Sequence, residues 1–126
     1  MNLTRLLRPL FAGRVRASHN WAYATEQVQR HQLQWLLQMG ASTEIGHRYN
    51  FGTMRSYEEY AAMVPQLAYP DIRNDVMRMV SGERDILWPG VTRRFAQSSG
   101  TSDGRSKYIP ITSDSLKRCH YHGSKD

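Results

Sequence analysis

A segment rich in serine, threonine and glycine has the composition of a polyphosphate-binding loop. It runs Ser98-Ser99-Gly100-Thr101-Ser102-Asp103-Gly104-Arg105-Ser106-Lys107. Glycines allow the backbone to turn so that successive N–H groups face one concavity, and hydroxyl groups supply further donors that rotate to fit an anion. Arg105 and Lys107 add positive charge at the same place. The segment therefore predicts a site for an anion that carries several phosphate groups.

Two common nucleotide-binding motifs do not fit this loop. A nucleotide-triphosphatase P-loop needs four residues between its glycines and then Lys followed by Ser or Thr. Here Gly100 and Gly104 enclose three residues, and Arg105 follows. A dinucleotide-binding fingerprint needs a third glycine and a helix directly after it. From composition alone, a hairpin loop without a ligand stays an alternative.

Two strands are expected to position the loop. Residues 91–97 and 107–112 read as strands, and Pro110 makes the second strand an edge or irregular one. Ser113 is expected to cap a short helix that runs through Leu116 and Cys119. The loop would then join two strands of a hairpin.

Helices are expected before the hairpin. Apolar residues recur at three- to four-residue intervals from Trp21 to Met39, which predicts a helix capped by Asn20 and ended by Gly40. Residues 42–49 read as a short helical turn or a loop. Trp35, on the stripe of the first helix, is expected to be a core anchor.

Two further helices have clear boundary signals. Ser56 and Glu59 have the spacing of a capping box, and the helix that follows should end before Pro65. A third helix should begin with Pro70 at its first position and end at Gly82. Its apolar face is expected to consist of Ile72, Val76, Met79 and Val80.

The chain of 126 residues is long enough for one domain. We divide it into a basic amphipathic segment (residues 1–25), a helical part (26–82) and a strand–loop–strand–helix part (83–126). The first segment has no acidic residue and four arginines. This composition suits an N-terminal helix, and it is also compatible with an organelle presequence or with contact to an acidic membrane.

The composition argues against a disulfide-stabilised, a membrane-spanning and a metal-binding protein. The single cysteine, Cys119, cannot form an internal disulfide, so a reducing compartment and a cytoplasmic location are expected. No apolar stretch is long enough to span a membrane. The cluster Cys119-His120-Tyr121-His122 offers too few ligands for structural zinc, and no metal site is predicted.

The charge balance favours anionic partners. There are 17 Lys and Arg residues against 11 Asp and Glu, a net charge of +6, and 14 of the basic residues are arginine. A small basic helical module that binds nucleic acid or another anion is therefore an alternative function. The arginines are spread along the chain, however, and no helix-turn-helix or zinc-finger spacing is visible.

The loop resembles the phosphate-binding motif of adenylate-forming enzymes, which include acyl-CoA synthetases and luciferases. Its continuation as Lys107-Tyr108-Ile109-Pro110 is similar to the Gretchen Hagen 3 branch, the auxin-responsive-promoter or acyl acid–amido synthetase family. In the segment that begins at Thr43, Ile45 stands where members of this family usually have an aromatic residue. The resemblance runs from Gln27 to Leu116 through an ordered series of segments. These are Thr43-Glu44-Ile45-Gly46-His47-Arg48-Tyr49, Ser56-Tyr57-Glu58-Glu59-Tyr60, Val64-Pro65, Tyr69, Gly82-Glu83, Leu87-Trp88-Pro89-Gly90 and Phe95-Ala96.

The resemblance implies an α/β fold, of which this chain would be the N-terminal part of a large adenylate-forming domain: mostly helices, then a strand–phosphate loop–strand unit. It implies ATP and Mg²⁺, with a small carboxylic acid and an amino acid as substrates. The acid is activated as an acyl-adenylate with release of pyrophosphate, and an amine then forms the amide.

The resemblance also assigns roles within the loop. The ATP phosphate-binding residues would be Ser98, Ser99, Gly100, Thr101, Ser102, Gly104 and Lys107, with Lys107 neutralising charge. Relatives in this family are several times longer than this chain, so we expect an N-terminal fragment that is inactive alone.

Overall fold

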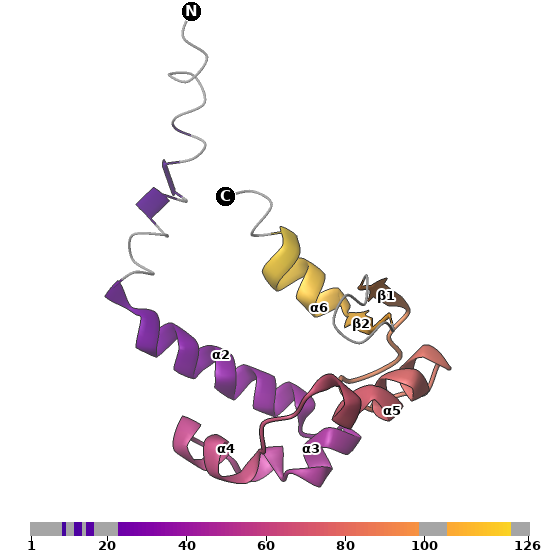
Figure 1. Ribbon diagram of the computed structural model, residues 1–126. Helices are drawn as coiled ribbons and strands as arrows, with labels where there is room; N and C mark the ends of the chain where they lie inside the picture. Colours follow the sequence, from indigo (N-terminus) through magenta and orange to yellow (C-terminus); the bar gives the residue numbers. More distant parts are fainter. Residues whose placement is uncertain (1–8, 10–11, 14, 17–22, 99–105, 122–126) are drawn as a thin grey trace, which may run out of the picture.

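The computed structural model describes residues 9, 12–13, 15–16, 23–98 and 106–121. In Figure 1, the long helix α2 has α3 and α4 on one side and α6 on the other, while α5 and the β1–β2 hairpin lie toward its C-terminal end. The elements in chain order are α2 (Thr25–Gly40), α3 (Glu44–Arg48), the 3₁₀-helix η1 (Phe51–Thr53), α4 (Tyr57–Met63), α5 (Tyr69–Val80), β1 (Arg94–Gln97), β2 (Tyr108–Ile111), α6 (Ser113–Ser115) and the π-helical turn η2 (Leu116–His120).

The core of the described part lies where the end of α2 meets α3, α5 and the segment after α5. Its apolar members are Leu37, Met54, Val76, Met79 and Ile86, each at most 3% exposed. These side chains come from four separate places along the chain. Because this core is small, the contacts between elements depend strongly on polar groups at the element ends.

The turn between α2 and α3 is built around a very close approach of two glycines. A Cβ atom at Gly46 would lie 1.9 Å from the carbonyl oxygen of Gly40, so only glycine fits at position 46. Thr43, which is fully buried, joins the two helices. Its hydroxyl donates to the Gly40 carbonyl over 2.7 Å and accepts from the Gly46 N–H over 3.1 Å. Thr43 is therefore the N-cap of α3.

The segment after α5 completes the first turn of α3. The carbonyls of Asp85 and Ile86 accept hydrogen bonds from the N–H groups of Glu44 and Ile45, over 2.8 and 3.1 Å. These are donors that a helix cannot satisfy by itself. The Asp85 carboxylate accepts a hydrogen bond from the Gly90 N–H over 2.6 Å, which fixes the turn between residues 85 and 90. Asp85 has a φ of 57°, a conformation that aspartate tolerates better than most residues.

The predicted boundaries of α4 are confirmed, whereas α5 begins at Tyr69, one residue before the predicted Pro70, and ends at Val80, two residues before Gly82. The Ser56 hydroxyl accepts from the Glu59 N–H over 3.2 Å, and α4 ends at Met63, before Pro65. The Glu59 carboxylate bonds to the N–H of Arg55 over 2.6 Å, one residue before the cap. Pro70 lies in the first turn of α5.

The hairpin is confirmed, with shorter strands than predicted. β1 pairs antiparallel with β2, with Arg94 opposite Ile111 and Gln97 opposite Tyr108. Thr112, not Ser113, caps the helix that follows: its hydroxyl accepts from the Ser115 N–H over 3.0 Å. Thr112 takes this role because its backbone is still extended, whereas Ser113 is already helical.

Some sequence-based expectations about burial are wrong. Val80 is 40% exposed, although it follows the apolar pattern of α5. Val28, which lies on the predicted apolar stripe of α2, is 43% exposed. The proposed cap Asn20 and the stripe residue Trp21 lie outside the described residues. Within the described part of the chain, α2 begins at Thr25. In the described part of the chain, no helix is both long and apolar enough to cross a membrane.

Candidate phosphate-binding site

The two described residues of the predicted phosphate site face each other at the end of the hairpin. The N–H of Ser98 donates to the carbonyl of Lys107 over 3.0 Å. In return, the N–H of Lys107 donates to the Ser98 hydroxyl oxygen over 3.3 Å. The hydroxyl uses a lone pair in this bond, so its hydrogen is still a donor suited to an anion. The hairpin thus brings together the first and last residues of the segment that sequence analysis singled out.

The rest of the predicted site falls outside the described residues. This applies to Ser99, Gly100, Thr101, Ser102 and Gly104, whose assigned contacts with phosphate stay predictions. The arrangement of Ser98 and Lys107 establishes where the segment leaves β1 and where it enters β2. Both ends are half-buried, so the loop starts from an anchored base.

Tyr69, at the start of α5, supports the Lys107 end of this base. Its hydroxyl oxygen accepts a hydrogen bond from the N–H of Tyr108 over 2.9 Å. The ammonium nitrogen of Lys107 lies 5.7 Å from the centroid of the Tyr69 ring, within the range of a cation–π contact. Sequence reasoning missed this role, because Tyr69 and Tyr108 are 39 residues apart.

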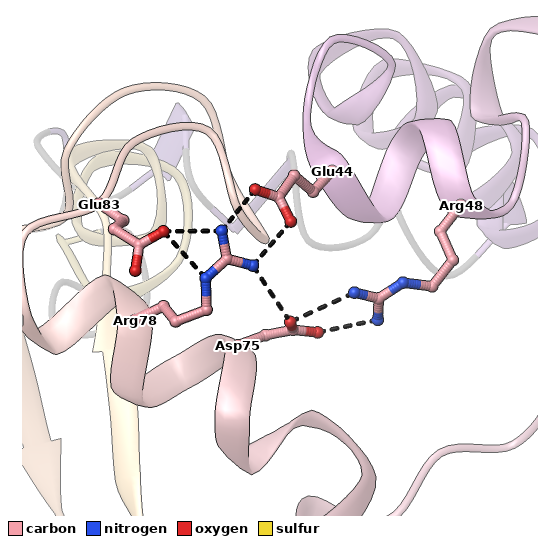
Figure 2. Close-up of polar contacts among 5 residues, drawn as sticks. All are labelled: Glu44, Arg48, Asp75, Arg78 and Glu83. Atoms are coloured by element: carbon pink, nitrogen blue, oxygen red, sulfur yellow. Dashed lines mark hydrogen bonds and ion pairs between the residues drawn. The ribbon is translucent and has the colours of Figure 1, made fainter.

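A cluster of charged residues fixes α5 against α3. Figure 2 shows Arg48 and Asp75 facing each other across the two helices. The Arg48 guanidinium donates two hydrogen bonds to the Asp75 carboxylate, over 2.8 and 3.2 Å. The Asp75 side chain is 8% exposed, while that of Arg48 is 41% exposed. This two-point contact with Arg48 offsets the desolvation cost of the buried Asp75 carboxylate.

Arg78 extends the same cluster to the segment after α5. Its guanidinium binds both carboxylate oxygens of Glu44, over 2.7 and 2.6 Å, and it also contacts Glu83 over 2.9 and 2.7 Å (Figure 2). These hydrogen bonds from Arg78 hold the pKa of Glu44 below its ordinary value. The bonds to Glu44 and then Glu83 raise the pKa of Arg78. The cluster therefore ties α3, α5 and the segment after α5 together.

Sequence analysis did not predict this charged cluster. Glu44 and Arg78 are 34 residues apart, and Arg48 and Asp75 are 27 apart, so no helical spacing relates them. One signal was available: Asp75 falls on the apolar face of α5 beside Val76 and Met79, all three of which are buried. A carboxylate on a buried face requires a hydrogen-bonding or oppositely charged partner.

Trp35 on α2 contacts both the segment after α5 and the C-terminal helix. The rings of Trp35 and Trp88 lie 5.6 Å apart between centroids, tilted by 50°. The Trp88 indole N–H donates to the Asp114 carboxylate over 3.2 Å, and the Arg118 guanidinium lies 3.9 Å from the Trp35 ring centroid. Trp35 is half-buried, so it packs against Trp88 and Arg118 at the edge of the fold and is not the anchor of the buried core that was predicted. The hairpin and its trailing helix are thus held on α2 as well as on α5.

A cavity of about 250 Å³ lies at the opposite end of the hairpin from Ser98 and Lys107. Its lining includes Trp88, Arg94 and Asp114, and neither end of the predicted phosphate loop contributes to it. Among the residues that the structure describes, no group of three or more His, Cys, Asp or Glu side chains could hold a metal ion. Cys119 and His120 are exposed, and His122 lies outside the described residues.

Comparison with known proteins gives consistent matches. A model of the GH3 family N-terminal domain matches residues 18–125. Indole-3-acetic acid-amido synthetase GH3.5 of Arabidopsis thaliana is 31% identical over 94 residues, which cover 74% of this chain and 15% of that protein. Jasmonoyl--L-amino acid synthetase GH3.5 of Oryza sativa subsp. japonica is 28% identical over 92 residues, 72% of this chain and 16% of that protein.

The relatives' names describe the joining of an acid to an amino acid. They give no support to the alternative of a small basic nucleic-acid-binding module. The chain spans about 15% of the length of the curated relatives it matches.

Proposed function

This chain belongs to the GH3 family, the Gretchen Hagen 3 family whose loop motif it carries, and we propose that it supplies the ATP phosphate-binding loop of an acid–amido synthetase. The reaction activates a small carboxylic acid with ATP and then joins the acyl group to the amine of an amino acid. This proposal rests on the family match over residues 18–125 and on the chemistry of the loop.

One observation about geometry carries the proposal furthest. The hairpin closes between Ser98 and Lys107, so a hydroxyl donor and an ammonium group stand at the two ends of one loop. A phosphate chain needs neutral donors and positive charge at close range, and this base provides one of each. Within the loop, Ser99, Gly100, Thr101, Ser102 and Gly104 would add hydroxyl and backbone N–H donors.

The loop would act by orientation and charge neutralisation. In acid activation, the carboxylate attacks the α-phosphate and pyrophosphate leaves, so negative charge develops on the leaving group. Donors and cations that already point at the β- and γ-phosphates stabilise that charge without rearranging. Lys107 would hold the charge at the β2 end of the loop. Mg²⁺ binds in proteins largely through substrate phosphates, and it would accompany ATP into this site.

The remaining steps are assigned to other parts of such an enzyme. The aligned segment covers 15% of the Arabidopsis relative, and the acid and amine sites are not expected within it. We therefore propose that the 126-residue chain binds MgATP weakly and does not form an acyl-adenylate by itself.

The test is a titration of the isotope-labelled chain with MgATP and with magnesium tripolyphosphate, followed by two-dimensional NMR. The proposed function predicts saturable shifts at the amides of Ser98 and Lys107 for both ligands, with adenosine giving none. Lys107→Gln should weaken binding, while Lys117→Gln, an exposed lysine on η2, should not. Shifts that are absent, or that are equal in the two lysine variants, would contradict the proposal.

ATP–pyrophosphate exchange measures the catalytic part of the proposal separately. We expect no exchange from the 126-residue chain with a panel of small carboxylic acids. Robust exchange by this chain would show that the acid site lies within it.

A further inference from the structure

Tyr69 is the one side chain from outside the hairpin whose described contacts reach both Lys107 and the residue after it. It lies in the first turn of α5, and it is half-buried against the start of β2. The sequence places it 38 positions before Lys107 (107 − 69), so packing alone brings the two together. Its two functional parts, the hydroxyl and the ring face, contact different groups of the hairpin.

The hydroxyl of Tyr69 fixes the backbone at the start of β2. Main-chain groups of successive residues in a strand point to opposite sides. Lys107 directs its N–H and carbonyl toward Ser98 on the β1 side, so the N–H of Tyr108 points away from β1. The Tyr69 oxygen accepts that N–H over 2.9 Å. An otherwise open strand edge is thereby held at the residue that follows Lys107.

The ring of Tyr69 restricts the side chain of Lys107. The ammonium nitrogen lies 5.7 Å from the ring centroid. Lysine has a long side chain with many rotamers, and ordering it on a ligand costs conformational entropy. A ring that already holds the ammonium group near the loop reduces this cost. Such preorganisation strengthens binding without any direct contact between the ring and the ligand.

We propose that Tyr69 is a positioning residue that orients Lys107 toward the phosphate groups of the bound ligand; this role rests on the proposed function of the loop. The hydroxyl fixes the position of the start of β2 relative to α5. The ring fixes the direction of the Lys107 ammonium group. Tyr69 does not touch the ligand. Its effect on binding therefore passes through Lys107, and it disappears when Lys107 has no charge.

The geometry itself is tested without any ligand. Protons above an aromatic ring face resonate upfield, so the methylene protons next to the Lys107 ammonium group should be shifted upfield in the wild-type chain. Tyr69→Phe keeps the ring and should keep the shift. Tyr69→Leu should abolish it. A wild-type spectrum without the shift, or a shift that survives in Tyr69→Leu, would overturn the proposal.

The functional consequence is tested by a double-mutant cycle with magnesium tripolyphosphate as the probe. An exposed cation–π contact corresponds to roughly a two- to fivefold change in affinity, and we expect Tyr69→Leu to weaken binding by about that factor. In the Lys107→Gln background, Tyr69→Leu should have no further effect. Tyr69→Phe should weaken binding less than Tyr69→Leu, because it keeps the ring and loses only the hydrogen bond to Tyr108.

The controls separate positioning from a loss of structure. Tyr60→Leu replaces another half-buried tyrosine, on α4, and should leave the affinity unchanged. A merely structural role of Tyr69 would give the same loss in both Lys107 backgrounds, and that result would overturn the proposal. Normal binding by Tyr69→Leu would also overturn it, while the proposed function would stand. Absence of binding by the wild-type chain would overturn the proposed function and this role with it.

Discussion

The backbone of Gly46 lies directly against the carbonyl oxygen of Gly40. A Cβ atom at position 46 would come within 1.9 Å of that oxygen and 2.8 Å of the carbonyl carbon. Both groups are backbone, so neither can rotate away as a side chain would. This contact brings the start of α3 onto the end of α2, and it places Glu44 and Arg48 beside α5. The charged cluster depends on this one glycine.

Gly46→Ala should therefore strongly destabilise the fold. We expect a loss of about 3 kcal/mol or more in the free energy of unfolding, because the added methyl group forces the two helices apart. Gly52→Ala is the matched control, since its added Cβ would meet only the Ala41 Cβ atom at 3.9 Å. Chemical denaturation followed by circular dichroism measures both. Equal stability of the two variants would contradict the close approach.

Asp75→Asn should destabilise the junction of α3 and α5. The substitution keeps the shape of the side chain but removes the charge that accepts two hydrogen bonds from Arg48. We expect a loss of about 2 kcal/mol in the free energy of unfolding, because Asp75 is buried. Glu26→Gln breaks an exposed pair with Arg30 on α2 and should cost less than about 0.5 kcal/mol. Similar losses in the two variants would argue against a special role of Asp75.

The pairing of Glu44 with Arg78 should make stability depend on pH. The hydrogen bonds from Arg78 lower the pKa of Glu44 in the folded chain. A carboxyl group whose folded pKa is depressed stabilises the fold above its unfolded pKa, and this contribution is lost as the pH falls through the folded pKa. Glu44→Gln should therefore flatten the acid limb of a plot of Tm against pH.

Carbon-detected NMR titration of the Glu44 carboxyl group measures this shift directly. The pKa should rise toward its ordinary value in Arg78→Gln, which removes the donor and leaves the carboxylate. A Glu44 pKa that is the same in the wild-type chain and in Arg78→Gln would contradict the assigned cause.

Trp35→Leu should release the C-terminal helix from α2. The substitution removes the ring that contacts Trp88 and carries the Arg118 guanidinium on its face. We expect the amides of residues 113–121 to exchange with solvent faster, because their contact with α2 is lost, while the amides of α5 keep their protection. Leu36→Ala changes the exposed neighbour on α2 and should leave residues 113–121 unchanged. Hydrogen exchange followed by mass spectrometry or NMR distinguishes these patterns.

The chain itself determined most of the local structure. The cap at Ser56, the break before Pro65 and the position of Pro70 in the first turn of α5 follow from the residues alone. Each of these signals acts within a few positions, through one hydrogen bond or one restricted backbone angle. The family resemblance rests on an ordered series of short segments, and the family match confirms it. Such motifs can be recognised from the sequence because each one consists of neighbouring residues.

Local sequence signals did not decide between neighbouring candidates for the same role, or how deeply a helix face is buried. Thr112 and Ser113 are adjacent hydroxyl residues, and either could have been the cap. The structure selects Thr112, because the extended strand β2 ends next to it. Val80 follows the apolar spacing of α5 but is exposed, because spacing defines a helix face without saying how far a neighbouring element covers it.

Only the tertiary structure decided which distant groups meet. Tyr69 reaches Tyr108 across 39 positions, and Arg78 reaches Glu44 across 34. No periodicity relates such pairs, since their separation depends on how whole helices pack. The same holds for the requirement for glycine at position 46, which comes from the Gly40 carbonyl of another helix. Residue types near one another in the chain thus predicted the chemistry of the loop, while the packing of α5 against β2 decided which side chain lies beside Lys107.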